Sequence, residues 1–353
     1  MHRNDANRLS LNDLQSKRLP PCSVRKVLKN VIGIAYIPKG INRFVRFVYG
    51  PVPSRRLGRS LGVNVIPFKT CNYSCVYCQL GKTTNLINER RSFFPKEEIL
   101  EELEKVLERV EADHVTFAGE GEPTLCGDLG WLIGRIKEIT DIPVAVITNG
   151  SLLYRRDVRE DLASADVVIP SLDAADERTF RRINRPHKDL SVDMVIEGLE
   201  EFGEEFEGKF YVEIMLVKGY NDDEDALRNI RSALERIEPD GVYLLTPIRP
   251  PTLNVEPADE MGIVRAHAIL GDVVDVIDPE VGEFSTECFS SVEEAVRAIL
   301  SRHPMREDQL KEFLKKFGED TSVLDGMEGI RRVEYLGKVF YVSFKGRSWM
   351  RGT

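Results

Sequence analysis

Apolar strands and amphipathic helices alternate along residues 61–270. Short runs rich in valine and isoleucine end at glycine, proline or small polar residues, and longer segments follow them whose apolar residues recur three and four positions apart. The predicted strands are residues 61–67, 114–119, 143–147, 167–170, 210–217 and 241–245. The predicted helices between them are residues 95–110, 129–139, 156–163, 194–206 and 222–237. This alternation predicts an α/β fold with a parallel sheet, and periodicity alone does not distinguish a partial barrel from a doubly wound sheet.

The pattern changes after Val276, where the strand–helix alternation ends. The elements predicted there are a helix at 291–302 that opens with a capping box, a helix at 306–317, a short helix at 322–327, and hairpin strands at 330–335 and 338–344. Helices followed by a small hairpin resemble a winged helix, so residues 286–353 are predicted to form a small winged-helix-like domain. Such domains bind nucleic acid or protein, and the lysines of the second helix stand among several acids, which favours neither partner.

Residues 1–45 differ from the rest in charge, because lysines and arginines greatly outnumber their two acidic residues, Asp5 and Asp13. Prolines break this segment into short pieces, among them Pro20-Pro21. One interpretation is a basic arm that binds RNA. The interpretation we favour is a poorly ordered extension, or translation from a start codon placed too early.

Composition narrows the class of protein. The chain has 353 residues, which suffices for about two domains. Its net charge of −9 gives no global signature of nucleic-acid binding. No apolar run approaches the roughly 20 residues that a membrane span needs, and no apolar segment of a secretory signal follows the first residues. We therefore expect a cytoplasmic protein with no membrane partner.

Three of the six cysteines lie within eight residues, at Cys71, Cys75 and Cys78. This C-x3-C-x2-C spacing allows one short loop to bind three irons of a [4Fe–4S] cluster, which is usually held by four thiolates. The fourth iron would then lack a protein ligand, and an open metal position is where chemistry can occur. Tyr77 directly precedes the last thiol, where it could cover a ligand bound at that iron.

Two alternatives to a catalytic cluster follow from the same cysteines. A structural zinc site normally has four protein ligands, often in two C-x2-C pairs, and no second pair or nearby histidine exists here. The other alternative is a non-catalytic iron–sulfur sensor that binds nucleic acid through the C-terminal domain. The remaining cysteines, Cys22, Cys126 and Cys288, are scattered, so a disulfide framework is not expected and a reduced compartment fits.

The cysteine motif, with Tyr77 before its last thiol, resembles that of the radical S-adenosylmethionine (SAM) superfamily. The resemblance covers about residues 51–250, and it implies an open (βα)6 partial TIM barrel within residues 46–285. It also implies that the fourth iron binds the amino and carboxylate groups of SAM. One electron, from a donor such as ferredoxin or flavodoxin, then cleaves SAM to a 5′-deoxyadenosyl radical that takes a hydrogen atom from the substrate. No catalytic residue beyond the cluster is predicted.

Residues that follow successive predicted strands match the positions that hold SAM in this family. Gly121 and Glu122 match its glycine–glutamate motif, and Arg185 lies in an Asn-Arg-Pro segment whose arginine pairs with the SAM carboxylate. Asn149, Ser171 and Asp173 are short polar residues at the next strand ends, suited to the ribose or carboxylate of SAM. The structural alternative for Asn149 is an Asn-Gly turn, and for Asp173 it is a helix cap near Asp176.

The substrate is the open part of the prediction. The run from Pro53 to Ser60 resembles the opening of a branch of uncharacterised Fe–S oxidoreductases related to wyosine-forming tRNA enzymes. Those tRNA enzymes carry further cysteines for a second cluster, and Cys22, Cys126 and Cys288 form no comparable series. A small molecule, a peptide and RNA all remain candidate substrates. Arg55 and Arg56 suit either an anionic substrate or a solvated turn.

Overall fold

The computed structural model describes residues 47–251, 253–276 and 282–343. The predicted basic extension, residues 1–45, lies outside the described residues, as do Cys22 and the last residues of the predicted winged-helix-like domain.

An eight-stranded, mostly parallel sheet organises the described chain, in the order β1-β2-β5-β6-β7-β8-β9-β10. The strands are β1 (Val48–Ser54), β2 (Gly58–Val63), β5 (His114–Phe117), β6 (Val144–Thr148), β7 (Val167–Pro170), β8 (Lys209–Met215), β9 (Gly241–Leu245) and β10 (Val274–Asp275). All pairs from β2 to β10 are parallel, and β1 alone is antiparallel to its neighbour. The predicted α/β fold with a parallel sheet is confirmed, and the predicted strands are β2 and β5 to β9.

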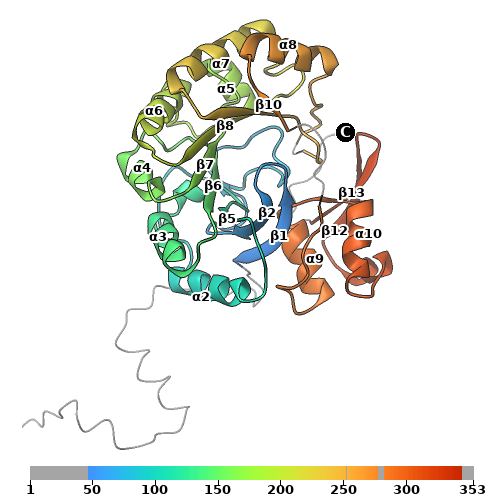
Figure 1. The fold of residues 1–353 in the computed structure, drawn as a ribbon. Helices are drawn as coiled ribbons and strands as arrows, with labels where there is room; N and C mark the ends of the chain where they lie inside the picture. The colour runs from blue at the N-terminus through green and yellow to red at the C-terminus, as the bar shows by residue number, and fades with distance from the viewer. Residues whose placement is uncertain (1–46, 252, 277–281, 344–353) are drawn as a thin grey trace, which may run out of the picture. The chain divides into compact units, whose positions relative to one another are not determined.

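Helices lie along the outside of this sheet, in a crescent that follows the strands (Figure 1). They are α2 (Lys96–Leu107), α3 (Leu129–Ile139), α4 (Arg156–Leu162), α5 (Glu177–Ile183), α6 (Val192–Glu205), α7 (Glu224–Ile237) and α8 (Glu260–Leu270). α7 illustrates why they form: Asp223 caps its first turn by accepting from the Ala226 N–H, and its apolar residues face one side.

Successive side chains along a strand point to opposite faces of the sheet and contribute to two different apolar clusters. Val144 and Val146 of β6 belong to the main core under the helices, whereas Ala145 between them belongs to a smaller cluster on the other face. The same alternation holds in β7, where Val168 faces the helices and Ile169 faces the smaller cluster. Because every parallel strand runs the same way, their carboxyl ends meet at one edge of the sheet.

Strand β1 was not predicted from the sequence. Its segment carries Pro51 and Pro53, which argue against a central strand because proline cannot donate to a ladder. The structure places it at the edge of the sheet, where proline is tolerated, with a register shift between Tyr49 and Val52. The predicted strand 61–67 is also corrected, because β2 begins at Gly58 and ends at Val63.

The C-terminal segment contains the predicted helices and hairpin. Its elements are α9 (Val292–Leu300), β11 (Met305–Arg306), α10 (Glu307–Lys315), the 3-10 helix η3 (Thr321–Gly326), β12 (Ile330–Tyr335) and β13 (Lys338–Ser343). The last strands form a three-stranded sheet in the order β11-β13-β12. Tyr49 and Val52 of β1 share an apolar cluster with Phe313 of α10 and Val296 of α9. The segment therefore packs on the edge strand, and its winged-helix assignment stays a prediction.

Phe313→Ala should destabilise both the C-terminal segment and β1. The Phe313 side chain is 1% exposed, and removing a buried phenyl group typically costs about 3–5 kcal/mol of unfolding free energy. Because Tyr49 and Val52 share its cluster, hydrogen exchange of the β1 amides should accelerate together with that of α10. Lys315→Ala, an exposed change on the same helix, is the control. Faster exchange in α10 with unchanged protection of β1 would contradict this coupling.

Candidate functional site

The three cysteines follow β2 at the carboxyl edge of the sheet: Cys71 ends the short strand β3 (Thr70–Cys71), and Cys75 and Cys78 lie in the cysteine loop after it. Backbone hydrogen bonds fix this loop to the end of α5. The Ser74 N–H donates to Asn184 O at 3.0 Å, and the Val76 N–H donates to Ile183 O at 2.9 Å. The His187 N–H donates to Asn72 O at 2.7 Å. The loop is therefore held along most of its length by a segment more than 100 residues away.

Each of the three sulfur atoms accepts a hydrogen bond from a nitrogen. Cys71 Sγ accepts from the Tyr73 N–H at 3.4 Å and from Asn149 Nδ2 at 3.7 Å. Cys75 Sγ accepts from Asn184 Nδ2 at 3.7 Å, and Cys78 Sγ accepts from Lys69 Nζ at 3.3 Å. Donors directed at sulfur stabilise thiolates and tune iron–sulfur clusters. The residues around the loop thus suit sulfurs that act as thiolate ligands.

The three thiols lie near one another without forming a site for a single metal ion. The cysteines are partly buried and close enough to interact electrostatically, but they are not placed to hold one metal ion. Zinc needs its sulfur ligands about 2.3 Å from a common point, whereas a cubane takes one thiolate at each of several irons. Burial raises the pKa of Cys71 to about 12 and that of Cys75 well above its usual value, so their ionised forms require a compensating positive charge.

Gly121 is required by a close approach of the chain to itself. A Cβ atom at this position would lie 1.8 Å from Thr70 O and 2.6 Å from Ile66 Cγ2. The Thr70 carbonyl is there because it accepts from the Glu122 N–H at 3.1 Å. The glycine therefore allows the segment after β5 to pair with the residue directly before Cys71.

Glu122 is buried, and its carboxylate points toward the end of β6. Its carboxylate accepts from the Thr148 and Thr124 hydroxyls at 2.5 and 2.6 Å and from the Asn149 N–H at 2.7 Å. Burial raises the pKa of Glu122, and these hydrogen bonds oppose the rise. The neighbouring Glu120 interacts elsewhere: its carboxylate lies 3.7 Å from the Arg302 guanidinium.

Asn149 belongs to the cysteine loop as well as to a turn. Its side-chain oxygen accepts from the Ser151 N–H at 3.0 Å, as expected of an Asn-Gly turn. Its Nδ2 also donates to Asn72 Oδ1 at 2.7 Å, in addition to its bond to Cys71 Sγ. The structure therefore shows the Asn-Gly turn, and the contact of Asn149 with SAM stays a prediction.

Asp173 does not cap helix α5, because Asp176 does so by accepting from the Thr179 N–H at 2.9 Å. Asp173 is instead 2% exposed, and its carboxylate accepts from Tyr77 Oη, from Asn184 Nδ2 at 2.6 Å and from the Met215 N–H at 2.9 Å. Burial raises the pKa of Asp173, and its donors lower it. The Tyr77 contact joins the cysteine loop directly to the end of β7.

Ser171 and Arg185 lie apart from this network. The Ser171 hydroxyl donates to Glu213 Oε1 at 3.1 Å, and Glu213 forms an ion pair with Arg56. Arg185 has an exposed side chain, a φ of 48°, and a backbone oxygen that accepts from the Ser74 N–H at 3.2 Å. The Arg56 side chain is largely buried in this ion pair and is not solvated, and its predicted binding of an anionic substrate stays a prediction.

Three residues of the site were not singled out from the sequence. Lys69, Asn72 and Asn184 are each at most 3% exposed and reach the cysteine loop through their side chains. Lys69 and Asn72 flank the first cysteine, so their proximity in sequence was an available signal. Asn184 stands in the Asn-Arg-Pro segment that pointed to Arg185, but its contact with Cys75 spans 109 positions and was not indicated by local sequence.

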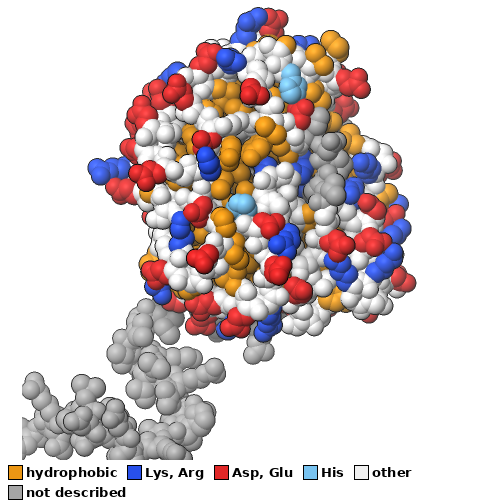
Figure 2. Space-filling model, viewed as in Figure 1, with side chains coloured by type: hydrophobic (Ala, Val, Ile, Leu, Met, Phe, Trp, Pro, Cys, Tyr) orange, Lys and Arg blue, Asp and Glu red, His pale blue; other side chains and the backbone are white. Residues whose placement is uncertain are grey.

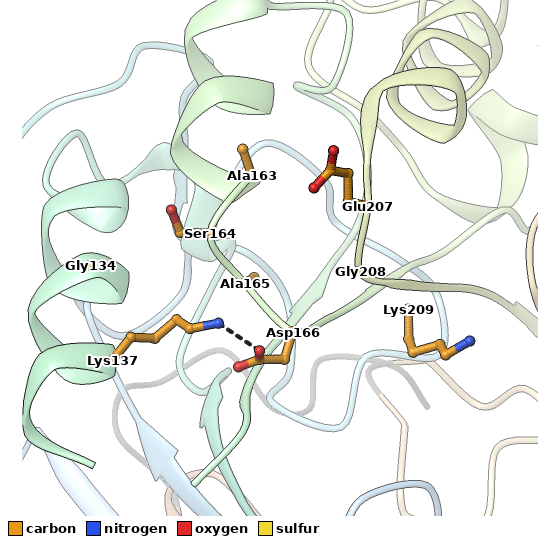
Figure 3. A pocket seen from close by; sticks show the side chains of 9 residues that line it. All are labelled: Gly134, Lys137, Ala163, Ser164, Ala165, Asp166, Glu207, Gly208 and Lys209. Atoms are coloured by element: carbon orange, nitrogen blue, oxygen red, sulfur yellow. Dashed lines mark hydrogen bonds and ion pairs between the residues drawn. The ribbon is translucent and has the colours of Figure 1, made fainter. Parts of the chain in front are cut away.

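The opposite edge of the sheet carries a hollow of a different kind. It has a volume of about 550 Å³ and lies at the amino ends of β7 and β8 (Figure 3). Lys137 Nζ pairs there with Asp166 Oδ1 at 2.6 Å. None of the predicted site residues lines it. In parallel α/β folds this edge contributes to stability, and active sites form at the carboxyl edge.

The comparisons with known proteins agree with the geometry. A family model described as the radical SAM superfamily matches residues 65–230. A UPF0026 protein of Methanocaldococcus jannaschii is 39% identical over 305 residues, which cover 83% of this chain and 95% of the relative. The chain belongs to the radical SAM superfamily. A UPF0026 protein of Helicobacter pylori is 31% identical over 267 residues, 74% of this chain and 86% of the relative.

More distant radical SAM proteins align with part of the chain. The probable GTP 3′,8-cyclase of Pyrococcus horikoshii is 31% identical over 189 residues, 52% of this chain and 57% of the relative. The crystal structure of a radical SAM methyltransferase from Sphaerobacter thermophilus covers 62% of this chain and 65% of that chain, at 14% identity and a TM-score of 0.46.

Membership in the radical SAM superfamily implies a [4Fe–4S] cluster and SAM. The residues described above fit both groups, since three thiols with nitrogen donors adjoin polar side chains at the carboxyl edge. Within the described residues, no helix is both long and apolar enough to cross a membrane.

Gly121→Ala should impair assembly of the radical SAM site. The added methyl group displaces Thr70 O and with it the start of the cysteine loop. After anaerobic reconstitution, we expect iron to fall from about four atoms per chain toward zero. Gly134→Ala is the matched control, because a Cβ in α3 at that position meets no atom within 4 Å. Equal iron content in the two variants would show that the close approach at Gly121 is dispensable.

Proposed function

We propose that this protein is a radical SAM enzyme that abstracts hydrogen from its substrate. Cys71, Cys75 and Cys78 would hold the [4Fe–4S] cluster, which, when reduced, supplies the electron that cleaves SAM to methionine and a 5′-deoxyadenosyl radical. The observation that carries the proposal is the set of nitrogen donors to all three sulfurs at the carboxyl edge of the sheet. The other described cysteines are engaged elsewhere: Cys126 lies in the main core, and Cys288 Sγ donates to Gly50 O at 2.8 Å.

SAM would lie against the residues that follow the strands. We assign its methionine moiety to Gly121, Glu122 and Arg185, and its ribose and remaining polar groups to Asn149, Ser171 and Asp173. Tyr77, held by Asp173, would cover the ligand at the open iron. Buried carboxylates and amides fixed by hydrogen bonds orient a ligand without further reorganisation.

The proposal extends to the domains, the compartment, the electron donor and the class of substrate. We assign the described residues within 46–285 to an open (βα)6 partial TIM barrel and those within 286–353 to a winged-helix-like domain. The protein works in the reducing cytoplasm with a ferredoxin or flavodoxin as electron donor. Among the relatives, the name of the GTP 3′,8-cyclase states a nucleotide substrate for that protein. Acidic and basic side chains are interspersed on the face of the molecule in Figure 2, which favours a small molecule over RNA as the substrate.

Reductive cleavage of SAM tests the proposal. Protein reconstituted anaerobically with iron and sulfide is incubated with SAM and dithionite, and 5′-deoxyadenosine is measured by mass spectrometry. We expect product from the wild type and none from Cys75→Ala, since the variant lacks one cluster ligand. If the wild type holds about four irons yet yields no product, and SAM leaves the EPR signal of its reduced cluster unchanged, the protein is a sensor and the proposal fails.

Arg185→Ala should weaken SAM binding without reducing iron content. Losing a charge-assisted hydrogen bond costs about 1.5–3 kcal/mol, which corresponds to a roughly 10- to 150-fold higher Kd. Equilibrium dialysis of SAM against reconstituted protein gives the Kd. Lys188→Ala removes an exposed cation from the same loop and serves as the control. Equal affinity in the two variants would remove Arg185 from the SAM site, whereas Asp173→Ala tests the buried part independently.

A further inference from the structure

A cleft lies between the exit of β9 and the C-terminal segment. It has a volume of about 320 Å³, within the range of small-molecule sites. One wall is the chain that follows β9, which includes Thr246 and Arg249, and the other comprises residues of α10 and the β12–β13 hairpin. Because β9 is parallel to β6 and β7, this cleft opens at the same edge of the sheet as the cysteine loop.

The charged side chains that line this cleft are all positive. Arg249, Arg306 and Lys338 line it, and none of its described lining residues is acidic. Further cations lie near Arg249: burial and the nearby charges of Arg55, Arg56 and Arg306 hold the pKa of Arg249 well below its usual value. Two of these cations are themselves paired, Arg56 with Glu213 and Arg306 with Asp308, whose carboxylate does not line the cleft. Gathered positive charge in a partly enclosed site favours an anionic ligand.

Gln309 contributes a hydrogen-bond donor. Its Oε1 accepts from the Arg306 N–H at 3.0 Å, which fixes the orientation of the amide. Its Nε2 is consequently a donor, and this atom is buried and has no hydrogen-bond partner within the described part of the chain. A buried donor left without an acceptor is costly, and a bound ligand would satisfy it.

The walls of the cleft are apolar and fixed. Ile248, Tyr335 and Phe340 line it beside the cations. The Tyr335 hydroxyl donates to Pro247 O at 3.0 Å, so the hairpin is attached to the exit of β9. Cations next to aromatic and aliphatic walls suit a ligand with an anionic group and a less polar body.

Arg249 also connects the cleft to the cysteine loop. Its Nη1 donates at 2.8 Å to Oε1 of Gln79, the residue directly after Cys78. The Gln79 Nε2 donates to Arg302 O at 2.9 Å, and the Leu253 N–H donates to Val76 O at 3.2 Å. A ligand held by Arg249 is thereby placed next to the loop that carries the three thiols.

We propose that this cleft binds a phosphate group of the substrate, and that the C-terminal segment serves to complete this substrate site. The substrate is then a phosphorylated small molecule whose less polar part extends from the cleft toward the cysteine loop. This assignment rests on the proposed radical SAM function, and it adds a substrate class to it.

Binding of radiolabelled inorganic pyrophosphate to the full-length, anaerobically reconstituted protein tests the assignment by equilibrium dialysis. Lys338→Glu reverses an exposed charge at the cleft, and Lys315→Glu makes the same change on α10 outside it. We expect Lys338→Glu to raise the Kd at least about tenfold and Lys315→Glu less than about twofold. Arg249→Gln, with iron content checked, should also raise the Kd.

Three results would overturn the assignment: no binding of pyrophosphate, equal effects of the two lysine variants, or displacement of pyrophosphate by citrate as readily as by phosphate. Equal effects would indicate a response to overall charge, and displacement by citrate would indicate a site for carboxylates. Pyrophosphate binding is measured without turnover, so it can be tested even if the protein does not cleave SAM. Conversely, if the protein forms 5′-deoxyadenosine normally but does not bind pyrophosphate, the phosphate site is wrong and the proposed radical SAM function stands.

Discussion

The structure depends on holding a loop with three thiols at the carboxyl edge of the sheet. Such a loop exposes backbone groups and sulfurs that must find partners once water is displaced. Segment 183–187 supplies backbone partners to residues 72–76, and the close approach at Gly121 supplies one to Thr70. Asn149, Asn184 and Lys69 then supply donors to the sulfurs. The hydrogen bonds of this one loop therefore hold together segments that are far apart in the chain.

Most of the fold follows from local pattern, and the exceptions have physical reasons. The strands β2 and β5 to β9 each carry buried apolar residues and alternate with helices that have one apolar face, so the sequence pattern identified them. Strand β1 contains two prolines and pairs only at the edge, and local propensity opposes its assignment. Its pairing is instead stabilised by Tyr49 and Val52, which pack against residues beyond position 280. Contacts of that separation leave no periodic signal.

The residues of the candidate site likewise fall into those that the sequence identified and those that it did not. The cysteines, Gly121 and Glu122 stand in short motifs whose spacing carries their chemistry, so the sequence identified them. Asp173 was ambiguous, because a short acid before a helix is equally suited to capping, and only the buried contacts with Tyr77 and Met215 separate it from Asp176. The contact of Asn184 with Cys75 and the cationic cleft could not be identified from the sequence, since both arise where distant segments meet.

The hydrogen bonds of Gln79 and Tyr335 give the C-terminal segment a role beyond packing. Gln79 lies between Arg249 and the Arg302 backbone, and Tyr335 is bonded to the chain after β9. Because these contacts join the C-terminal segment to both the cysteine loop and the last parallel strands, its docking and the geometry of the site are coupled. A radical reaction requires a substrate held in place and shielded from water. A segment that packs on the edge strand, and that adds cations and aromatic side chains to the cleft after β9, suits the substrate site proposed above.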